Sequence, residues 1–170
     1  MRRCPLVLAL SVALAGCAPP ATGVPVPDAA QTASVVRTVD GDTLVLLGTG
    51  RGPLPAAPAR VRLLLVDAPE VPGGCLGRPA ADRLAALVPD GAVVRVRADR
   101  VRVDRYDRLL LHVWTADGRN VGEVLLREGL ARVLVVAPNR RHLAAFRAAE
   151  ATARQADRGT WSACRGAPPA

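Results

Sequence analysis

Short β-rich segments separated by turn signals constrain the fold of this chain more than any other feature. They occupy residues 34–39, 44–47, 60–66, 92–103, 108–115 and 131–136. The first two flank Asp40-Gly41-Asp42, a turn signal, and the fourth alternates apolar and charged residues in the period of a strand with one face in water. Closing about five such strands into a small antiparallel barrel removes their exposed edges, so we expect a barrel at the core.

Three segments have the apolar spacing of helices, at residues 79–88, 121–128 and 140–156. Each ends at a stop signal: Pro89-Asp90-Gly91, Gly129 and Arg158-Gly159. Because these helices lie between and after the strands, the sequence predicts a single α+β domain over residues 34–164. Residues 165–170 are then a C-terminal tail.

The N-terminal residues predict export rather than a part of the fold. A positive start, Met1-Arg2-Arg3, precedes an apolar run at 6–15 and Leu14-Ala15-Gly16-Cys17, the layout of a secretory signal over residues 1–17. The run is shorter than the roughly 20 residues that span a bilayer. The last four residues resemble the bacterial lipobox, in which Cys17 would be lipidated; an ordinary cleaved signal is the alternative.

A flexible Ala/Pro tether is expected to follow the signal, over residues 18–33. The protein would then be exported, either anchored through Cys17 on the outer side of the bacterial cell membrane or secreted. The remaining cysteines, Cys75 and Cys164, suggest a disulfide in such a chain, and two free buried thiols are the alternative. A bridge between them would contribute about 4–5 kcal/mol in the chain-entropy model.

The charge balance favours an anionic partner. The formal net charge is +8, and it remains +6 without Arg2 and Arg3. This excess attracts polyanions such as nucleic acid or an acidic envelope surface, and charge alone does not distinguish between them.

Two acidic motifs stand beside predicted strands. Asp67-Ala68-Pro69-Glu70 has the spacing of a helix capping box, but Val71-Pro72-Gly73-Gly74 cannot continue a helix, because Pro and Gly cost about 3 and 1 kcal/mol there. A solvated turn is the remaining structural interpretation. In Asp40-Gly41-Asp42, two acids around one glycine repel each other unless solvent or a cation offsets their charge.

Two arginines, Arg62 and Arg108, lie within or at the start of apolar runs, where an unpaired charge is costly. Embedded arginines and strand-end carboxylates together are the groups that phosphodiester cleavage requires. Carboxylates hold a hard divalent cation and act on water, and guanidinium groups match phosphate oxygens in a bidentate manner.

The segments "VDGDTL", "VRLLLVDAPE", "DRYDRLL" and "EVLLREGLARV" resemble, in this order, the motifs of the thermonuclease family, whose type member is staphylococcal nuclease. The resemblance covers about residues 35–162. It implies a five-stranded OB-fold β-barrel with three helices and calcium-dependent hydrolysis of DNA and RNA. The cofactor would be Ca²⁺, and the partner would be the nucleic-acid substrate.

The resemblance also implies roles for individual residues. Asp42 and Asp67 would bind calcium together with the backbone carbonyl of Ala68. Glu70 would position or deprotonate the attacking water.

The remaining roles concern the phosphate and the nucleotide. Arg62 and Arg108 would hold the phosphate and stabilise the charge that develops on it. Tyr106 and Asp104 would contact the nucleotide or support their loop, and Asp40 would support the calcium ligands without touching the ion.

Several positions depart from the family pattern. Asp107 stands where glycine is common, and Val135 and Ala137 stand where two tyrosines line the nucleotide pocket of the type member, so about 1–3 kcal/mol of stacking per base is in question. Gly122 replaces an asparagine, which could loosen its surroundings. We assign structural roles to His112 and His142.

Two other classes of function compete with the nuclease hypothesis. One is a non-catalytic OB-fold module that binds nucleic acid or other polyanions at the cell envelope, and the other is a structural envelope lipoprotein. The presence of the whole acidic and basic set favours the enzyme. No obligate protein partner is evident, so we expect a monomer.

Overall fold

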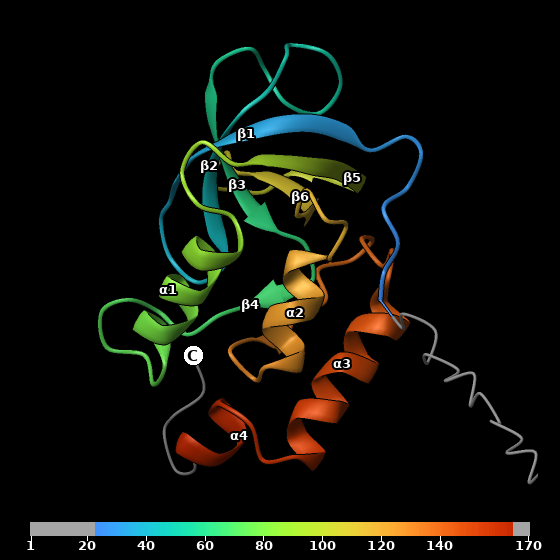
Figure 1. Ribbon diagram of the computed structural model, residues 1–170. Coiled ribbons are helices and arrows are strands. Elements are labelled where there is room, and N and C mark those ends of the chain that lie inside the picture. The colour runs from blue at the N-terminus through green and yellow to red at the C-terminus, as the bar shows by residue number, and fades with distance from the viewer. Residues whose placement is uncertain (1–22, 165–170) are drawn as a thin grey trace, which may run out of the picture.

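A closed barrel of five strands forms the centre of the computed structural model, which describes residues 23–164 (Figure 1). The strands are β1 (Gln31–Thr38), β2 (Thr43–Leu47), β3 (Pro58–Leu63), β5 (Val93–Val103) and β6 (Leu109–Trp114). They close in the order β1-β2-β3-β6-β5. The predicted α+β fold with a five-stranded barrel is therefore confirmed.

One strand pair departs from the antiparallel arrangement that we expected. β3 and β6 run parallel, with Val61 beside Leu109 and Arg62 beside Leu110, whereas the other neighbouring pairs are antiparallel. The barrel is therefore mixed, and the prediction of an antiparallel barrel is wrong. The parallel register brings Arg108, which immediately precedes β6, close to the level of Arg62 on β3.

The predicted strand at 60–66 is divided in two by a turn. β3 ends at Leu63, Leu65 adopts a left-handed conformation with φ of 62°, and β4 (Val66–Asp67) then leaves the barrel. β4 pairs with β7 (Arg132–Val133), so the predicted strand at 131–136 is reduced to two residues. The turn carries Asp67 away from the barrel wall and back towards Arg62.

The described residues form four helices outside the barrel: α1 (Gly77–Leu87), α2 (Val121–Arg127), α3 (Leu143–Gln155) and α4 (Thr160–Ala163). α1 begins after the turn at 71–74, which agrees with the rejection of a helix cap at Asp67. α3 begins three residues later than predicted because His142 adopts a positive φ of 66°, and α4 was not predicted. In the described part of the chain, no helix has the length and apolar character needed to cross a membrane.

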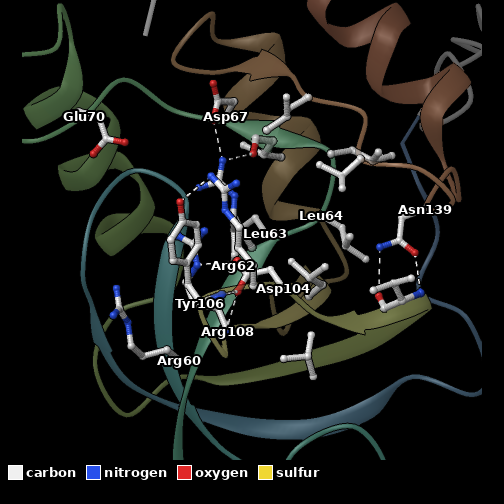
Figure 2. A pocket seen from close by; sticks show the side chains of 18 residues that line it. Arg60, Arg62, Leu63, Leu64, Asp67, Glu70, Asp104, Tyr106, Arg108 and Asn139 are labelled. Carbon is white, nitrogen blue, oxygen red and sulfur yellow. Dashed lines mark hydrogen bonds and ion pairs between the residues drawn. The ribbon is translucent and has the colours of Figure 1, made fainter.

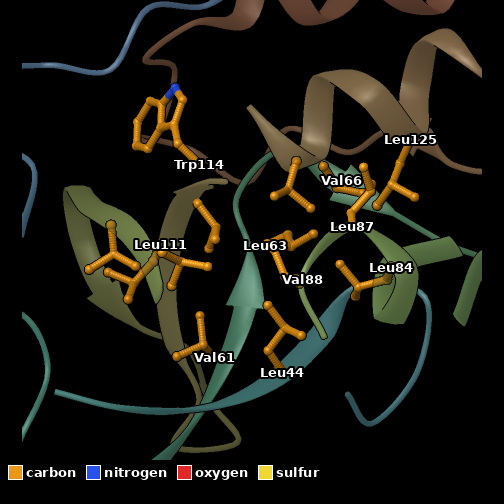
Figure 3. Close-up of a cluster of buried hydrophobic side chains, with 14 of the residues drawn as sticks. Leu44, Val61, Leu63, Val66, Leu84, Leu87, Val88, Leu111, Trp114 and Leu125 are labelled. Atoms are coloured by element: carbon orange, nitrogen blue, oxygen red, sulfur yellow. The ribbon is translucent and has the colours of Figure 1, made fainter. Parts of the chain in front are cut away.

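The core fills the barrel and continues beneath the helices (Figure 3). Leu44, Val61 and Leu111 come from the barrel, and Leu84 and Leu125 come from α1 and α2. All five are completely buried, so the strands and helices share one hydrophobic core.

Gly122 lies at a tightly packed point of this core. A Cβ atom at Gly122 would lie 2.7 Å from Val66 Cγ2 and 3.1 Å from the ring of Phe146 on α3. Glycine therefore permits the close approach of α2, α3 and β4, which is the opposite of the loosening that the sequence suggested.

The packed domain begins before residue 34. Val24 is 3% exposed, its N–H donates to Glu123 Oε2 at 2.7 Å, and its carbonyl accepts from Trp114 Nε1 at 2.9 Å. Residues 24–33 therefore differ from the flexible tether expected there. The predicted signal, Cys17 and the tail at 165–170 lie outside the described residues.

Candidate active site

The turn between β1 and β2 presents Asp42 to the interior of the site. Asp40 Oδ1 accepts the N–H of Asp42 at 3.0 Å and holds the turn. A Cβ on Gly41 would lie 2.6 Å from the Ala68 Cβ and 2.8 Å from the Ala80 Cβ, so glycine is required where this turn meets α1. Asp42 itself is 3% exposed.

Arg62 joins the two carboxylates that the sequence predicted to act together. Its Nη1 lies 3.1 Å from Asp42 Oδ1, and its Nη2 lies 2.6 Å from Asp67 Oδ1 (Figure 2). The turn at Leu65 makes this possible, because it folds β4 back over the side chain that projects from β3. The guanidinium group of Arg62 therefore lies between two acids from different segments of the chain.

The environment of Asp42 strongly disfavours its bare negative charge. Burial raises the pKa of Asp42 to about 6, and the charge of Arg62 and the N–H of Ala68 offset only part of this effect. The Ala68 N–H donates to Asp42 Oδ2 at 3.1 Å. A further positive charge at this point would stabilise the carboxylate.

The donor atoms suit a hard cation. Within residues 23–164, no group of three or more His, Cys, Asp or Glu side chains is gathered as a ready-made ligand set. Asp42 and Asp67 nevertheless converge on one positive charge, and carboxylate oxygens are the ligands that calcium prefers. The residues therefore fit a divalent cation whose remaining ligands would be backbone carbonyl groups and water.

Glu70 lies at the edge of the same site, but the structure does not bring it into contact with the other two acids. It follows Pro69 in an exposed turn, lines the groove, and stands apart from Arg62 and Asp67 in Figure 2. Its backbone carbonyl accepts the N–H of Gly74 at 2.9 Å. The position of Glu70 is thus set by its backbone turn.

Arg108 is held in the turn between β5 and β6 by Asp104. The Asp104 carboxylate accepts Arg108 Nε at 2.8 Å, the Arg108 N–H at 3.0 Å and the Tyr106 N–H at 2.9 Å. Burial acts to raise the pKa of Asp104, but these hydrogen bonds and the charge of Arg108 lower it overall. Asp104 therefore supports its loop and stays ionised beside Arg108.

Tyr106 is the exposed aromatic group of this turn. Its ring is 59% exposed, and the guanidinium carbons of Arg105 and Arg108 lie 4.7 and 5.3 Å from the ring centroid. Asp107 has a positive φ of 57°, which explains why glycine is favoured at this point of such a turn. The turn thus combines two arginines, one aromatic ring and Asp107, which forms no ion pair within residues 23–164.

Arg62, Asp67, Glu70 and the turn that carries Arg108 line one groove of about 890 Å³, and the buried Asp42 contacts this lining through Arg62. Its polar lining consists of Arg60, Arg62, Asp67, Glu70, Asp104, Arg105, Tyr106, Arg108 and Asn139. Figure 2 shows Glu70 and Arg60 near one end and Asn139 at the other. An extended chain carrying negative charges fits this shape, because the arginines are distributed along it.

Sequence reasoning missed Arg60, Asn139 and the apolar floor of the groove. Arg60 lies two residues before Arg62, and strand alternation could have placed both on one face. Asn139 is 1% exposed and bonds both the N–H and the carbonyl of Val101, at 2.8 and 3.0 Å. No local signal in the sequence indicates this pairing between distant segments.

The floor of the groove includes aliphatic residues that follow β7. Leu134 and Val136 line the groove, whereas Val135 packs against the core and Ala137 faces a different hollow. The groove surface at Leu134 and Val136 is aliphatic, so these two residues offer no ring on which a base could stack.

A disulfide links the turn that carries Glu70 to the end of the chain. The sulfur atoms of Cys75 and Cys164 lie 2.06 Å apart, with their Cα atoms 5.8 Å apart. Cys75 lies just before α1, and Cys164 directly follows α4.

Comparisons with known proteins agree with this geometry. Residues 60–163 match the family described as Staphylococcal nuclease homologue. The chain is 38% identical over 132 residues to Endonuclease YncB of Bacillus subtilis (strain 168), which covers 74% of this chain and 59% of that protein. The chain thus spans less than two thirds of the length of that relative.

Two further relatives match over most of their own length. An uncharacterized endonuclease of Escherichia coli is 33% identical over 135 residues, covering 79% of this chain and 80% of that protein. A thermonuclease of Staphylococcus hyicus is 30% identical over 138 residues, covering 78% and 76%. The chain belongs to the staphylococcal nuclease homologue family.

Proposed function

We propose that this protein is a calcium-dependent nuclease that hydrolyses phosphodiester bonds of DNA, RNA or both by attack of water. The observation that carries the proposal is the convergence of Asp42 and Asp67 on Arg62, which lines one groove together with Asp67, Glu70 and Arg108. The names of the relatives, endonuclease and thermonuclease, support the same activity.

Asp42, Asp67 and the carbonyl of Ala68 would hold the calcium ion. When bound, the ion would polarise the phosphate and supply positive charge beside the reacting bond. The desolvated carboxylate of Asp42 favours such an ion, since burial already raises its pKa to about 6.

Arg62 and Arg108 would bind the phosphate oxygens and stabilise the charge that develops on them. Asp104 engages the Nε edge of Arg108, and within residues 23–164 the terminal amino groups of Arg108 form no further ion pair. Arg62 is different, because its guanidinium is shared by two acids. It becomes available to a phosphate when another cation neutralises those acids.

Glu70 would orient the attacking water and accept its proton on a carboxylate oxygen. Its exposure and its freedom from side-chain partners among the described residues leave it able to turn towards the groove. A leaving oxygen would then take a proton from solvent, because the groove is open.

The decisive experiment compares wild type with Glu70→Gln on single-stranded DNA and on RNA, with calcium or with a chelator. We expect calcium-dependent cleavage by wild type and a loss of about 100-fold or more in kcat for the variant. Asp90→Asn, which neutralises an exposed acid in the turn after α1, is the matched control and should retain activity. Cleavage that is equal in wild type and Glu70→Gln would refute the proposed mechanism, and binding without cleavage would identify a polyanion-binding module instead.

We also propose that the nuclease acts outside the cytoplasm as a monomer, anchored through lipidated Cys17 or secreted after cleavage of its signal. The signal-like N-terminus supports export, and the paired Cys75 and Cys164 suit an oxidising compartment. Cys17→Ser should release the protein from membranes in cell fractionation. Unchanged fractionation would exclude the lipid anchor.

A further inference from the structure

We propose that the Cys75–Cys164 disulfide is a positioning device for Glu70, so that full hydrolytic activity requires the oxidised protein. This inference rests on the proposed function, because it concerns the residue that acts on the attacking water. The disulfide lies outside the groove. It would nevertheless affect catalysis, in addition to the general stabilisation that any disulfide supplies.

Glu70 and Cys75 belong to the same tightly folded turn. The Gly74 N–H donates to the Glu70 carbonyl at 2.9 Å, and the Gly77 N–H donates to the Gly74 carbonyl at 2.9 Å. A Cβ on Gly74 would lie 2.6 Å from the Glu70 carbonyl oxygen and 2.7 Å from its nitrogen, and one on Gly77 would also collide with that oxygen. Because the backbone is folded onto itself without spare room, movement of Cys75 shifts the backbone of Glu70.

The rest of this turn is weakly held. Residues 70–73 are exposed, and within the described chain the Glu70 side chain forms no ion pair or hydrogen bond that would fix it. The placement of the Glu70 carboxylate therefore depends on the backbone of residues 70–74. The position of that backbone depends in turn on the disulfide that holds Cys75.

The other end of the disulfide is firmly anchored. The Thr160 N–H donates to the Gly129 carbonyl at 2.8 Å, which joins α4 to the end of α2. The ring of Trp161 lies between Arg154 and Arg132, whose guanidinium carbons are 4.3 and 5.0 Å from its centroid. In Figure 1, α4 lies beside α3, and the turn before α1 lies at the opposite side of α4. The bond thus fastens the exposed turn that carries Glu70 to α4.

Reduction would remove this constraint while leaving the barrel intact. A dithiol reductant supplies two electrons and two protons; the S–S bond breaks, Cys75 and Cys164 become thiols, and the dithiol becomes a cyclic disulfide. Asp42, Arg62 and Arg108 are positioned by the barrel and its turns, so their geometry does not depend on the bond. We therefore expect kcat to fall by about 10- to 100-fold, as for a displacement of about 1 Å at a reacting group, with little change in substrate affinity.

The test compares oxidised wild type, wild type treated with dithiothreitol, and a Cys75→Ser/Cys164→Ser variant, all as the full chain with calcium. Both forms without the bond should be folded by circular dichroism at the assay temperature, lose kcat and retain KM, and the variant should be insensitive to dithiothreitol. Ser162→Ala, on α4 between the anchor and Cys164, is the control and should keep both the activity and the sensitivity to reductant of wild type.

A second variant tests the mechanism with the bond intact. Gly74→Ala should crowd the Glu70 backbone and reproduce the fall in kcat while the disulfide remains closed. Hydrogen exchange should report the same event locally: reduction should accelerate exchange in residues 70–77 and leave β3 and β6 unchanged.

Three outcomes would overturn the inference: unchanged kcat after reduction, unchanged exchange in residues 70–77, or loss of activity that occurs only with global unfolding. If oxidised wild type shows no calcium-dependent cleavage, the proposed function fails. The rate of hydrogen exchange in residues 70–77, before and after reduction, then still decides whether the disulfide positions this turn.

Discussion

Nη1 of Arg62 lies 3.1 Å from Oδ1 of Asp42, a carboxylate whose side chain is only 5% exposed. Arg62 is therefore the internal counter-ion of the metal-free site as well as a candidate phosphate ligand. If Asp42 binds calcium as proposed, the ion and Arg62 would compete for the charge of the same carboxylate.

Replacement of Arg62 by glutamine tests this relationship. In Arg62→Gln, Asp42 would lose its charged partner, so the metal-free protein should lose about 1–3 kcal/mol of unfolding free energy. Calcium should then raise the Tm of the variant more than that of wild type, as measured by thermal melts with calcium or chelator. Arg60→Gln changes a neighbouring arginine that is not paired with Asp42 and should respond to calcium like wild type; an equal calcium shift in Arg62→Gln would contradict the model of competition.

Asp107 should weaken substrate binding without a structural benefit. Its carboxylate lies in the turn of Arg108, and its φ of 57° suits glycine better than aspartate. Asp107→Gly should lower KM by about two- to fivefold at low salt, and the gain should vanish at high salt because exposed charges are screened. Asp107→Asn removes the charge but keeps a side chain tolerated at positive φ; if it leaves KM unchanged, charge is not the cause.

Asn139 should control the far end of the groove. Its side chain bonds both backbone groups of Val101, and Asn139→Ala would remove both hydrogen bonds at a partly buried site. We expect a loss of about 1–2 kcal/mol in denaturant unfolding and a raised KM with a nearly unchanged kcat. A fall in kcat with unchanged KM would show instead that this end of the groove affects the reacting groups.

The buried ring of His112 should make the protein acid-sensitive. Burial lowers the pKa of His112 to about 3, with a smaller lowering by His142 and an opposing contribution from Asp99. Because the pKa in the unfolded chain is about 6.5, the unfolded state binds the extra proton first as the pH falls. The stability linked to His112 is therefore complete above about pH 6.5 and declines between about pH 6.5 and 3, by up to about 1.4 kcal/mol per pH unit.

His112→Leu isolates this effect. The ring contacts Trp114, His142 and Phe146 at centroid distances of 6.1, 5.0 and 5.6 Å, so an apolar residue suits the site. The free energy of unfolding of the variant should depend less on pH over this interval. The raised pKa of Asp42 has the opposite effect on stability, because the folded state binds that proton first as the pH falls. This effect is the same in wild type and variant. If the free energy of unfolding changes with pH equally in wild type and variant, His112 is not the source of the acid sensitivity.

Gly122 should tolerate no larger residue. Gly122→Asn, which restores the residue common in the family, should destabilise the protein by about 1–3 kcal/mol, since its Cβ would overlap Val66 and crowd Phe146. Ala144→Asn, at an exposed position of α3, is the control for helix propensity. Equal melting temperatures for both variants would show that α2 and α3 can separate without cost.

The sequence predicted those parts of the molecule that depend on neighbouring residues. The strands, the turns around Asp42 and Asp104, and the failure of a helix at Asp67 follow from local propensities and charge. The left-handed turn at Leu65 was missed, because a leucine with φ of 62° is held there by the pairing of β4 with β7, a contact between distant segments.

The lining of the groove shows the same limit. Motif spacing identified Arg62 and Arg108, but it did not predict that Leu134 and Val136 would line the groove beside them. β7 ends at Val133, so strand alternation does not extend through these residues. Their orientation follows from packing on the core, which no local pattern encodes.

The parallel pairing of β3 with β6 has a consequence for how such enzymes can diversify. Arg62 projects from one strand and Arg108 stands at the start of its neighbour, so the distance between their backbones is set by the pairing of two strands that lie about 4.8 Å apart. The loop between β2 and β3 can change in length or composition without altering that pairing, whereas the turn between β5 and β6 must keep Asp104, which holds Arg108. Substrate preference can therefore change through substitutions in the loops. The spacing of the two arginines stays constant as long as the barrel keeps the pairing of β3 with β6.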